Sequence, residues 1–282
     1  MAPRVSGRID AHVHLWDRTT DPQDWIDPQT MQAIDRDFGA DELTAMLAST
    51  GVRSAIVVQA SNSLDESVRL ARLASPVIAG LVAWVDLAGD IRGQLDRIRM
   101  GGATPVVGIR HLAHIDPDPE WLSREEVGRG MAALEAERLS FDLVVRDWQL
   151  GQAARLADRH DGMRFVLDHL GGPPAPGGDL GEWAAGLREL ARRPNVTAKL
   201  SGLSSGLAAG SWTARDLAPV VDVALDAFGP SRLMYGSDWP LAELGGGAPA
   251  WIAAVETLLD GLSAAERDRV FGGTAREAYS LA

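Results

Sequence analysis

The sequence predicts an α/β protein, a single-domain (β/α)₈ TIM barrel, and three observations support this fold class. Short β-branched runs recur along the whole chain, each followed by a turn and a stretch with helical spacing of apolar residues. The length of 282 residues suits one large barrel. Polar side chains also stand where nearly every apolar run ends, as expected of a barrel that carries a site at one rim.

Eight strands are expected, at regular intervals from the N-terminus onward. They cover residues 8–14, 54–59, 77–84, 105–110, 140–145, 164–169, 195–200 and 232–236. Helices are expected between them, most clearly at 123–138, 181–193 and 213–228. The first of these starts with the pattern of a capping box, formed by Ser123 and Glu126.

A doubly wound open sheet is the main alternative fold. Such sheets usually carry a glycine-rich turn after the first strand, whereas this chain has HLWDRTT there. The composition does not shift along the chain, and the segment GGPPAPGG at 171–178 reads as a loop over the barrel mouth. We therefore expect one domain over residues 1–282.

Composition and charge limit the classes of partner. The net charge is −12 and the sequence pI is about 4.9, without clusters of basic residues, which argues against nucleic acid and membrane surfaces as partners. The chain has no cysteine, so any metal must be bound by histidines and carboxylates. We see no signal peptide and no apolar stretch of about 18 residues, which favours a cytoplasmic protein. The oligomeric state stays open, with a homo-oligomer among the possibilities.

The segment DAHVHLWD at 10–17 is the most informative part of the chain. If a strand covers it, Asp10, His12 and His14 project to one face. Three ionisable groups on one face of a buried strand require partners or a ligand. The segment therefore predicts either a metal or water site at the end of a barrel strand, or a pair of structural histidines.

The other predicted strands also end in polar or aromatic residues. The full set at the strand ends comprises His12, His14, Gln59, Trp84, Asp86, Arg110, His111, Arg146, His169, Lys199, Ser201 and Asp238. Because the carboxyl ends of barrel strands meet at one rim, this pattern favours an enzyme.

Several motifs resemble those of the amidohydrolase superfamily, in particular its branch of sugar-acid lactonases, which includes L-fuconolactonases, L-rhamnonolactonases and sulfomuconolactone hydrolases. They are DAHVHLWD at 10–17, GIRH at 108–111, FDLVVRDWQL at 141–150, FVLDHLGGP at 165–173, NVTAKLSGL at 195–203, FGPSRLMYGSDWP at 228–240 and VFGGTAREAY at 270–279. The resemblance covers nearly the whole chain. It implies a (β/α)₈ barrel that opens a lactone ring.

The resemblance further implies that His12, His14, His169 and Asp238 form the reaction centre. Two positions depart from the pattern of relatives. Gly172 stands where the branch usually has lysine, and Arg146 stands where members with a firmly held metal often have histidine.

These four residue types suit lactone hydrolysis in either of two ways. Asp238 would act as general base towards a water molecule. With a divalent ion, zinc or manganese, the three histidines and Asp238 would be the ligands, and the metal would polarise the carbonyl. Without a metal, protonated histidines would donate hydrogen bonds to the developing oxyanion.

Residues around this centre are expected to contact the substrate. Arg110, Arg146 and Lys199 would form a cationic rim that favours an anionic or hydroxyl-rich ligand. Tryptophans next to polar strand ends suit the apolar face of a sugar ring. The predicted substrate-binding set is Gln59, Trp84, Arg110, His111, Arg146, Trp148, Lys199 and Trp239.

Three functions are therefore compared. The first is a lactonase that acts on a small-molecule sugar-acid or related carboxylated lactone. The second is a metal-dependent non-oxidative decarboxylase of the same superfamily, and the third is a barrel that binds a sugar acid without catalysis. The stretches KLSGL and RDWQL favour the lactonase, and the intact set of four site residues argues against a pure binder.

Overall fold

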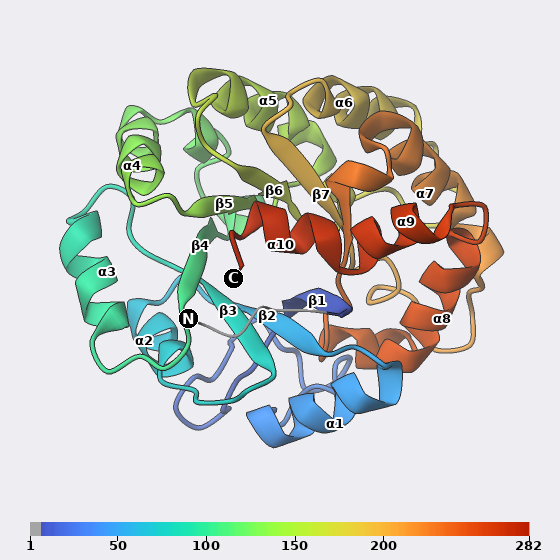
Figure 1. Cartoon of the computed structure of the whole chain (residues 1–282), viewed down its shortest axis with the longest axis horizontal. Helices are drawn as coiled ribbons and strands as arrows, with labels where there is room; N and C mark the ends of the chain where they lie inside the picture. The colour runs from blue at the N-terminus through green and yellow to red at the C-terminus, as the bar shows by residue number, and fades with distance from the viewer. Residues whose placement is uncertain (1–6, 282) are drawn as a thin grey trace.

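The structure, a computed structural model, describes residues 7–281 and contains one eight-stranded parallel sheet in the order β1 to β8 (Figure 1). The strands are β1 Ile9–Val13, β2 Ser54–Val58, β3 Ile78–Ala83, β4 Val106–His111, β5 Ser140–Leu143, β6 Phe165–Leu167, β7 Val196–Leu200 and β8 Leu233–Tyr235. A parallel bridge between Val13 and Trp239 joins the two ends of the sheet into a ring. The predicted barrel is confirmed, and all eight predicted strands are present with small shifts at their ends.

Helices surround the sheet on its outer side, and the last of them, α10, lies across one end of the barrel (Figure 1). They are α1 Ala40–Thr50, α2 Leu64–Ala71, α3 Ile91–Arg99, α4 Glu125–Ala136, α5 Leu150–Arg159, α6 Gly181–Ala191, α7 Ala214–Phe228, α8 Ala248–Leu258, α9 Ala264–Asp268 and α10 Thr274–Ala278. Short helical turns cover η1 Ala113–Ile115, η2 Trp121–Ser123, η3 Asp147–Gln149, η4 Asp168–Gly171, η5 Pro230–Arg232, η6 Leu241–Gly245 and η7 Arg269–Gly273.

The apolar core has two parts. The larger lies between strands and helices, as expected where helices cover a parallel sheet. The smaller joins residues of β1, β2, β3, β6 and β8 to the C-terminal segment. Its members are Ile9, Ala11, Ile56, Val58, Val82, Val166, Met234, Ala275, Ala278 and Tyr279. We identify this smaller cluster as the filling of the barrel interior near its amino-terminal end.

The expectation that Asp10, His12 and His14 project to one face of the strand is wrong. Ile9 and Ala11 belong to the interior cluster, whereas Val13 and Leu15 pack in the outer core. The pairing register of β1 with β2 shifts between Asp10 and Val13, and such an irregularity changes which face a side chain takes. Asp10 consequently does not share the face of the two histidines.

The predicted capping box of the helix at 123–138 is also wrong. Ser123 belongs to η2, and α4 begins at Glu125 without a side-chain cap. Thr213, by contrast, caps α7 in a capping box with Asp216.

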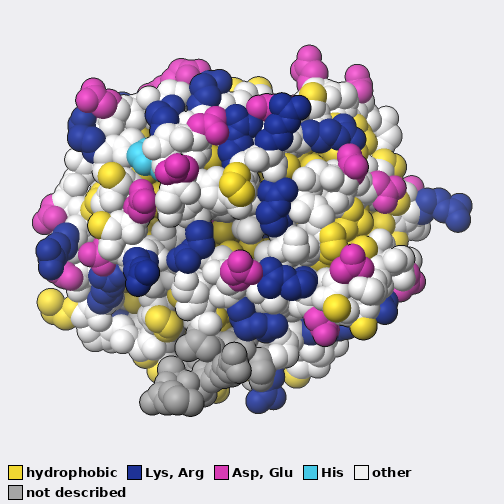
Figure 2. Space-filling model, turned by 45° about the horizontal axis from the view of Figure 1, so that its top comes forward, with side chains coloured by type: hydrophobic (Ala, Val, Ile, Leu, Met, Phe, Trp, Pro, Cys, Tyr) yellow, Lys and Arg dark blue, Asp and Glu magenta, His cyan; other side chains and the backbone are white. Residues whose placement is uncertain are grey.

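In the part of the chain that the structure describes, no helix is long and apolar enough to cross a membrane. Acidic and basic side chains are interspersed on the face shown in Figure 2. The assignment of residues 1–282 to one domain stays a prediction.

Candidate active site

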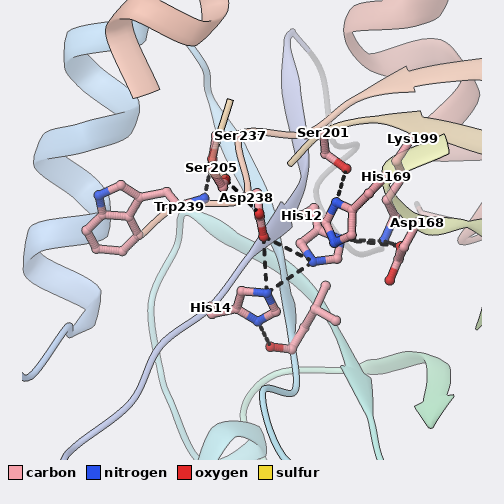
Figure 3. Close-up of polar contacts among 12 residues, drawn as sticks. His12, His14, Asp168, His169, Lys199, Ser201, Ser205, Ser237, Asp238 and Trp239 are labelled. Carbon is pink, nitrogen blue, oxygen red and sulfur yellow. Dashed lines mark hydrogen bonds and ion pairs between the residues drawn. The ribbon is translucent and has the colours of Figure 1, made fainter. Parts of the chain in front are cut away.

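Three side chains converge at the carboxyl end of the barrel, where β1 and β8 meet (Figure 3). The Nε2 atoms of His12 and His14 lie 3.1 Å apart. Asp238 Oδ1 lies 3.7 Å from Nε2 of His12 and 3.5 Å from Nε2 of His14. All three residues are buried. Residues 226 positions apart in sequence therefore form one compact group with the geometry of a small-ion or water site.

Backbone pairing between β1 and the segment after β8 holds this group together. The amide of Asp238 donates to the carbonyl of His12 over 2.9 Å, and the amide of His14 donates to the carbonyl of Trp239 over 2.7 Å. Asp238 has a left-handed backbone with φ of 60°. Such conformations cost energy in residues other than glycine and concentrate at functional sites. The local backbone therefore directs the carboxylate towards the histidines.

Hydrogen-bond partners determine which atoms remain free in this group. His14 Nδ1 lies 2.8 Å from the Val58 carbonyl, which accepts only, so Nδ1 donates and the Nε2 of a neutral ring bears a lone pair. Asp238 Oδ2 accepts from Ser205, whereas Oδ1 is buried without a partner among the described residues. Acceptor atoms facing one another across a buried space are the arrangement that a cation satisfies.

The charge states of the three residues are consistent with metal ligation. Burial lowers the pKa of His14, and burial together with the Lys199 ammonium holds the pKa of His12 well below its usual value. Burial alone would raise the pKa of Asp238, but the charge of His169, followed by the nearby His14 ring, brings it below its ordinary value. Neutral imidazoles and an ionised carboxylate are the states that bind metals. The residues therefore fit a divalent cation.

His169 stands at the edge of the group and is half-buried. Its ring centre lies 4.5 Å from that of His12, and its Nδ1 lies 2.9 Å from the Ser201 hydroxyl. It has a left-handed backbone with φ of 52° inside η4. A Cβ atom at Gly202, itself at φ of 69°, would lie only 2.5 Å from His169 Nδ1. The site therefore requires glycine at 202 for the imidazole to take this position.

Two cations that we predicted at the rim are instead buried against His12, with Lys199 Nζ 3.1 Å from Nδ1 and the Arg110 guanidinium 3.3 Å from Nε2. Lys199 is fully buried, with Nζ 2.6 Å from Asp142 Oδ2 and 2.9 Å from Asp168 Oδ1. Arg110 donates to Asp168 Oδ2 over 2.8 Å. Two cations thus face two carboxylates on the floor of the site. The sequence could not show this, because both side chains extend inward from the ends of their strands.

Gln59, Trp84 and His111 form contacts within the protein. Gln59 donates to the carbonyl of Arg110 over 3.2 Å and accepts from its guanidinium. Trp84 Nε1 donates to His111 Nδ1 over 3.1 Å, and His111 Nε2 lies 2.8 Å from Asp116. The His111 ring also stacks on Trp121. These residues therefore already have hydrogen-bond or stacking partners within the protein, and a substrate would have to compete with those contacts.

The remaining predicted contacts divide into a core residue and two exposed ones. Trp239 packs edge-on against Phe38 and points away from His14 in Figure 3, so its indole lies in the core and not against the group. Arg146 and Trp148 are exposed beyond the end of β5, with 56% of Trp148 accessible. These two are the predicted contacts that remain open to a ligand.

Sequence reasoning missed the acidic residues around His12. Asp168 Oδ1 lies 3.3 Å from His12 Nδ1, the atom opposite the ring's Nε2. Although burial opposes ionisation, Lys199 and His12 hold the pKa of Asp168 well below its usual range. Carboxylates behind a ligating histidine orient its ring. The position of Asp168 directly before His169 could have indicated that it lies near the site. Asp142 lies inside a strand, and nothing in the sequence indicated its role.

Comparisons with known proteins agree with this architecture. A family model described as Amidohydrolase matches residues 9–281. An L-fucono-1,5-lactonase from Burkholderia ambifaria is 35% identical over 97% of this chain and 96% of its own length. The structure of an amidohydrolase from Burkholderia multivorans with bound zinc is 35% identical, has a TM-score of 0.90, and matches 98% of this chain and 100% of its own. A 5-carboxyvanillate decarboxylase from Sphingomonas paucimobilis is only 15% identical over 98% of this chain and 99% of its own, with a TM-score of 0.62, and shares the fold alone. The chain belongs to the amidohydrolase family.

Proposed function

We propose that this amidohydrolase opens the ring of a neutral sugar-acid lactone, with Asp238 as general base. The observation that carries the proposal is the convergence of three atoms within 3.7 Å of one another: His12 Nε2, His14 Nε2 and Asp238 Oδ1, which has no hydrogen-bond partner among the described residues. The full-length similarity to an L-fucono-1,5-lactonase supports the reaction class. The decarboxylase alternative has no comparable support, because its representative is more distant in sequence.

The residues of the chain account for the proton movements of hydrolysis. Water adds to the lactone carbonyl carbon while Asp238 Oδ1 accepts its proton, and the Ser205 hydroxyl keeps Oδ2 in place. His169, half-buried beside the group, donates a hydrogen bond to the oxyanion. The ring C–O bond then breaks, and the proton passes from Asp238 to the ring oxygen, which yields the open hydroxy acid.

We further propose that His12, His14 and Asp238 hold a divalent cation such as zinc or manganese. When bound, such an ion polarises the carbonyl and acidifies water. The zinc in the 35% identical relative supports this assignment. His12 and His14 present neutral nitrogen donors, and Asp168 behind His12 supplies the orienting carboxylate.

Charge balance below the site favours a neutral substrate over a carboxylated one. Lys199 and Arg110 are already paired with Asp142 and Asp168. Of the predicted substrate-binding cations, Arg146 alone lacks a carboxylate partner among the described residues, and it is exposed at the rim. A lactone rich in hydroxyl groups therefore fits better than one with ring carboxylates.

A panel of lactones tests the proposal. It contains L-fucono-1,5-lactone, other aldono-1,5- and 1,4-lactones, and a lactone with ring carboxylates, each monitored with a pH indicator. We expect acid release from at least one neutral aldonolactone and little from the carboxylated compound. A flat trace across the panel contradicts the reaction class. Preferred hydrolysis of the carboxylated lactone contradicts the charge argument while leaving the reaction intact.

A further inference from the structure

The C-terminal segment closes the end of the barrel opposite to the site (Figure 1). Arg276 in α10 donates to the carbonyl of Gly7, two residues before β1, over 2.9 Å. Thr274 donates to the carbonyl of Ser231, two residues before β8, over 3.0 Å. Tyr279 follows α10 and is buried in the interior cluster. Its side chain therefore enters the barrel from the end where the strands begin.

A continuous run of buried contacts leads from Tyr279 to the site. The Tyr279 hydroxyl donates to Asp142 Oδ2 over 2.7 Å, and Lys199 Nζ donates to the same oxygen over 2.6 Å. Lys199 Nζ also lies 3.1 Å from His12 Nδ1 and 2.9 Å from Asp168 Oδ1. In Figure 3, Lys199 and Asp168 lie on the other side of the His12 ring from His14 and Asp238.

Two carboxylates explain why this run restrains the imidazole. The ammonium of Lys199 donates to Asp142 and Asp168, and this places Nζ 3.1 Å from His12 Nδ1. Its position therefore depends on where the Asp142 carboxylate stands. The Tyr279 hydroxyl fixes that carboxylate from below, because both donors share Oδ2. A shift of Asp142 moves the ammonium that stands against the His12 ring.

We propose that Tyr279 is a positioning residue of the active site and acts on His12 through Asp142 and Lys199. The proposal rests on the role proposed above for His12, but it does not depend on which lactone is the substrate. It makes the C-terminal segment, at the far end of the barrel, a part of the machinery that orients a metal ligand.

The two tyrosines of the chain provide a matched test. Tyr279→Phe removes the hydroxyl that holds Asp142. Tyr235→Phe removes an equally buried hydroxyl that has no partner among the described residues. Zinc affinity is measured by competition with a chelator, together with kcat, KM and the melting temperature. We expect Tyr279→Phe to weaken zinc binding and lower kcat by about 2- to 10-fold at similar KM, which corresponds to one hydrogen bond. Tyr235→Phe should change neither.

Asp142→Asn provides a second variant that keeps the shape of the side chain. It removes the charge that anchors Lys199, and we expect a loss of about 10- to 100-fold in zinc affinity or kcat, as for other groups behind metal ligands. The side-chain ¹⁵N shifts of His12, assigned with a His12→Asn variant, give a readout that needs neither zinc nor substrate. We expect them to move in Tyr279→Phe and to stay unchanged in Tyr235→Phe.

The results separate this inference from the proposed function. Absence of lactone hydrolysis in the unmodified protein refutes the proposed function, while the zinc affinities and His12 shifts still decide the role of Tyr279. If Tyr279→Phe matches Tyr235→Phe in zinc affinity, kcat and His12 shifts, the positioning role is wrong. A change in melting temperature alone, with these three readouts unaltered, also refutes it.

Discussion

The mouth and the floor of the barrel contain similar polar residues but differ in how these residues are paired. At the mouth, His12, His14 and Asp238 bring acceptor atoms together, and Asp238 Oδ1 lacks a partner among the described residues. On the floor, Lys199 and Arg110 pair with carboxylates at 2.6–2.9 Å, although Asp142 Oδ1 and Arg110 Nε lack a hydrogen-bond partner among the described residues. Buried charges are normally paired within the protein. The group at the mouth, whose carboxylate has no lysine or arginine partner among the described residues, thus indicates where a cation binds, and the ion pairs of the floor indicate what supports it.

The largest expected effect comes from removing the free acceptor at the mouth. Asp238→Asn should lower kcat by about 10²- to 10⁴-fold, because a general base contributes on this scale. Steady-state kinetics and circular dichroism check the activity and the fold. Asp65→Asn, which alters a carboxylate on the outer surface, should retain full activity. Near-normal turnover by Asp238→Asn would remove this residue from the base role and weaken the contrast between mouth and floor.

A cation should bind to the group of His12, His14 and Asp238 at the mouth and leave the ion pairs of the floor unchanged. At free zinc of 100 times Kd, we expect about 2.7 kcal/mol of stabilisation, a rise in melting temperature of about 5–10 °C. His14→Ala should abolish this rise, because it removes one of the convergent nitrogens. His160→Ala, at the end of α5, is the control and should preserve it. Equal responses of both variants to zinc would place the metal elsewhere.

Glu66 tests whether a buried carboxyl group that has hydrogen-bond partners makes the stability of the folded protein depend on pH. It accepts from the amides of Ala60 and Ser61 and from Gln23, and burial followed by the charge of Asp21 raises its pKa to about 7 from 4.5. The folded protein thus holds this proton more tightly than the unfolded chain. Its contribution to stability is complete below about pH 4.5 and is lost as the pH rises through about 7.

The measurement compares urea unfolding of the unmodified protein and Glu66→Gln at pH 5 and pH 8. We expect the unmodified protein to lose on the order of 1–3 kcal/mol more than the variant between these two values. Parallel losses in both proteins would show that Glu66 keeps an ordinary pKa, and that its partners outweigh the cost of burial.

The smallest expected effect lies at the outer rim. Trp148→Ala should raise KM for the best lactone by about 2- to 10-fold, since an aromatic contact with a sugar ring contributes on that scale. The melting temperature should stay within a few degrees, because the side chain is 56% exposed. Met100→Ala, which alters an exposed residue outside the barrel mouth, is the matched control. An unchanged KM in Trp148→Ala would confine substrate recognition to the buried group.

The sequence predicted the barrel well because its signals are local. Each strand shows as a short apolar run, and HVH places two histidines together regardless of the rest of the chain. The expected rim position of Lys199 and Arg110 is wrong, because a strand-end position does not show whether a long side chain extends to solvent or into the barrel. Trp239 lies away from the group for a related reason. Its neighbour Asp238 points into the site, so the next side chain points away from it, towards Phe38. Partners such as Asp142 and Tyr279 are distant in sequence and become visible only in three dimensions.

The bridge between Val13 and Trp239 bears on how this protein acquires activity during synthesis. His12 and His14 leave the ribosome more than 220 residues before Asp238, the carboxylate that faces them. A nascent chain therefore lacks the assembled group until β8 docks beside β1. Closure of the ring and assembly of the site are thus one event.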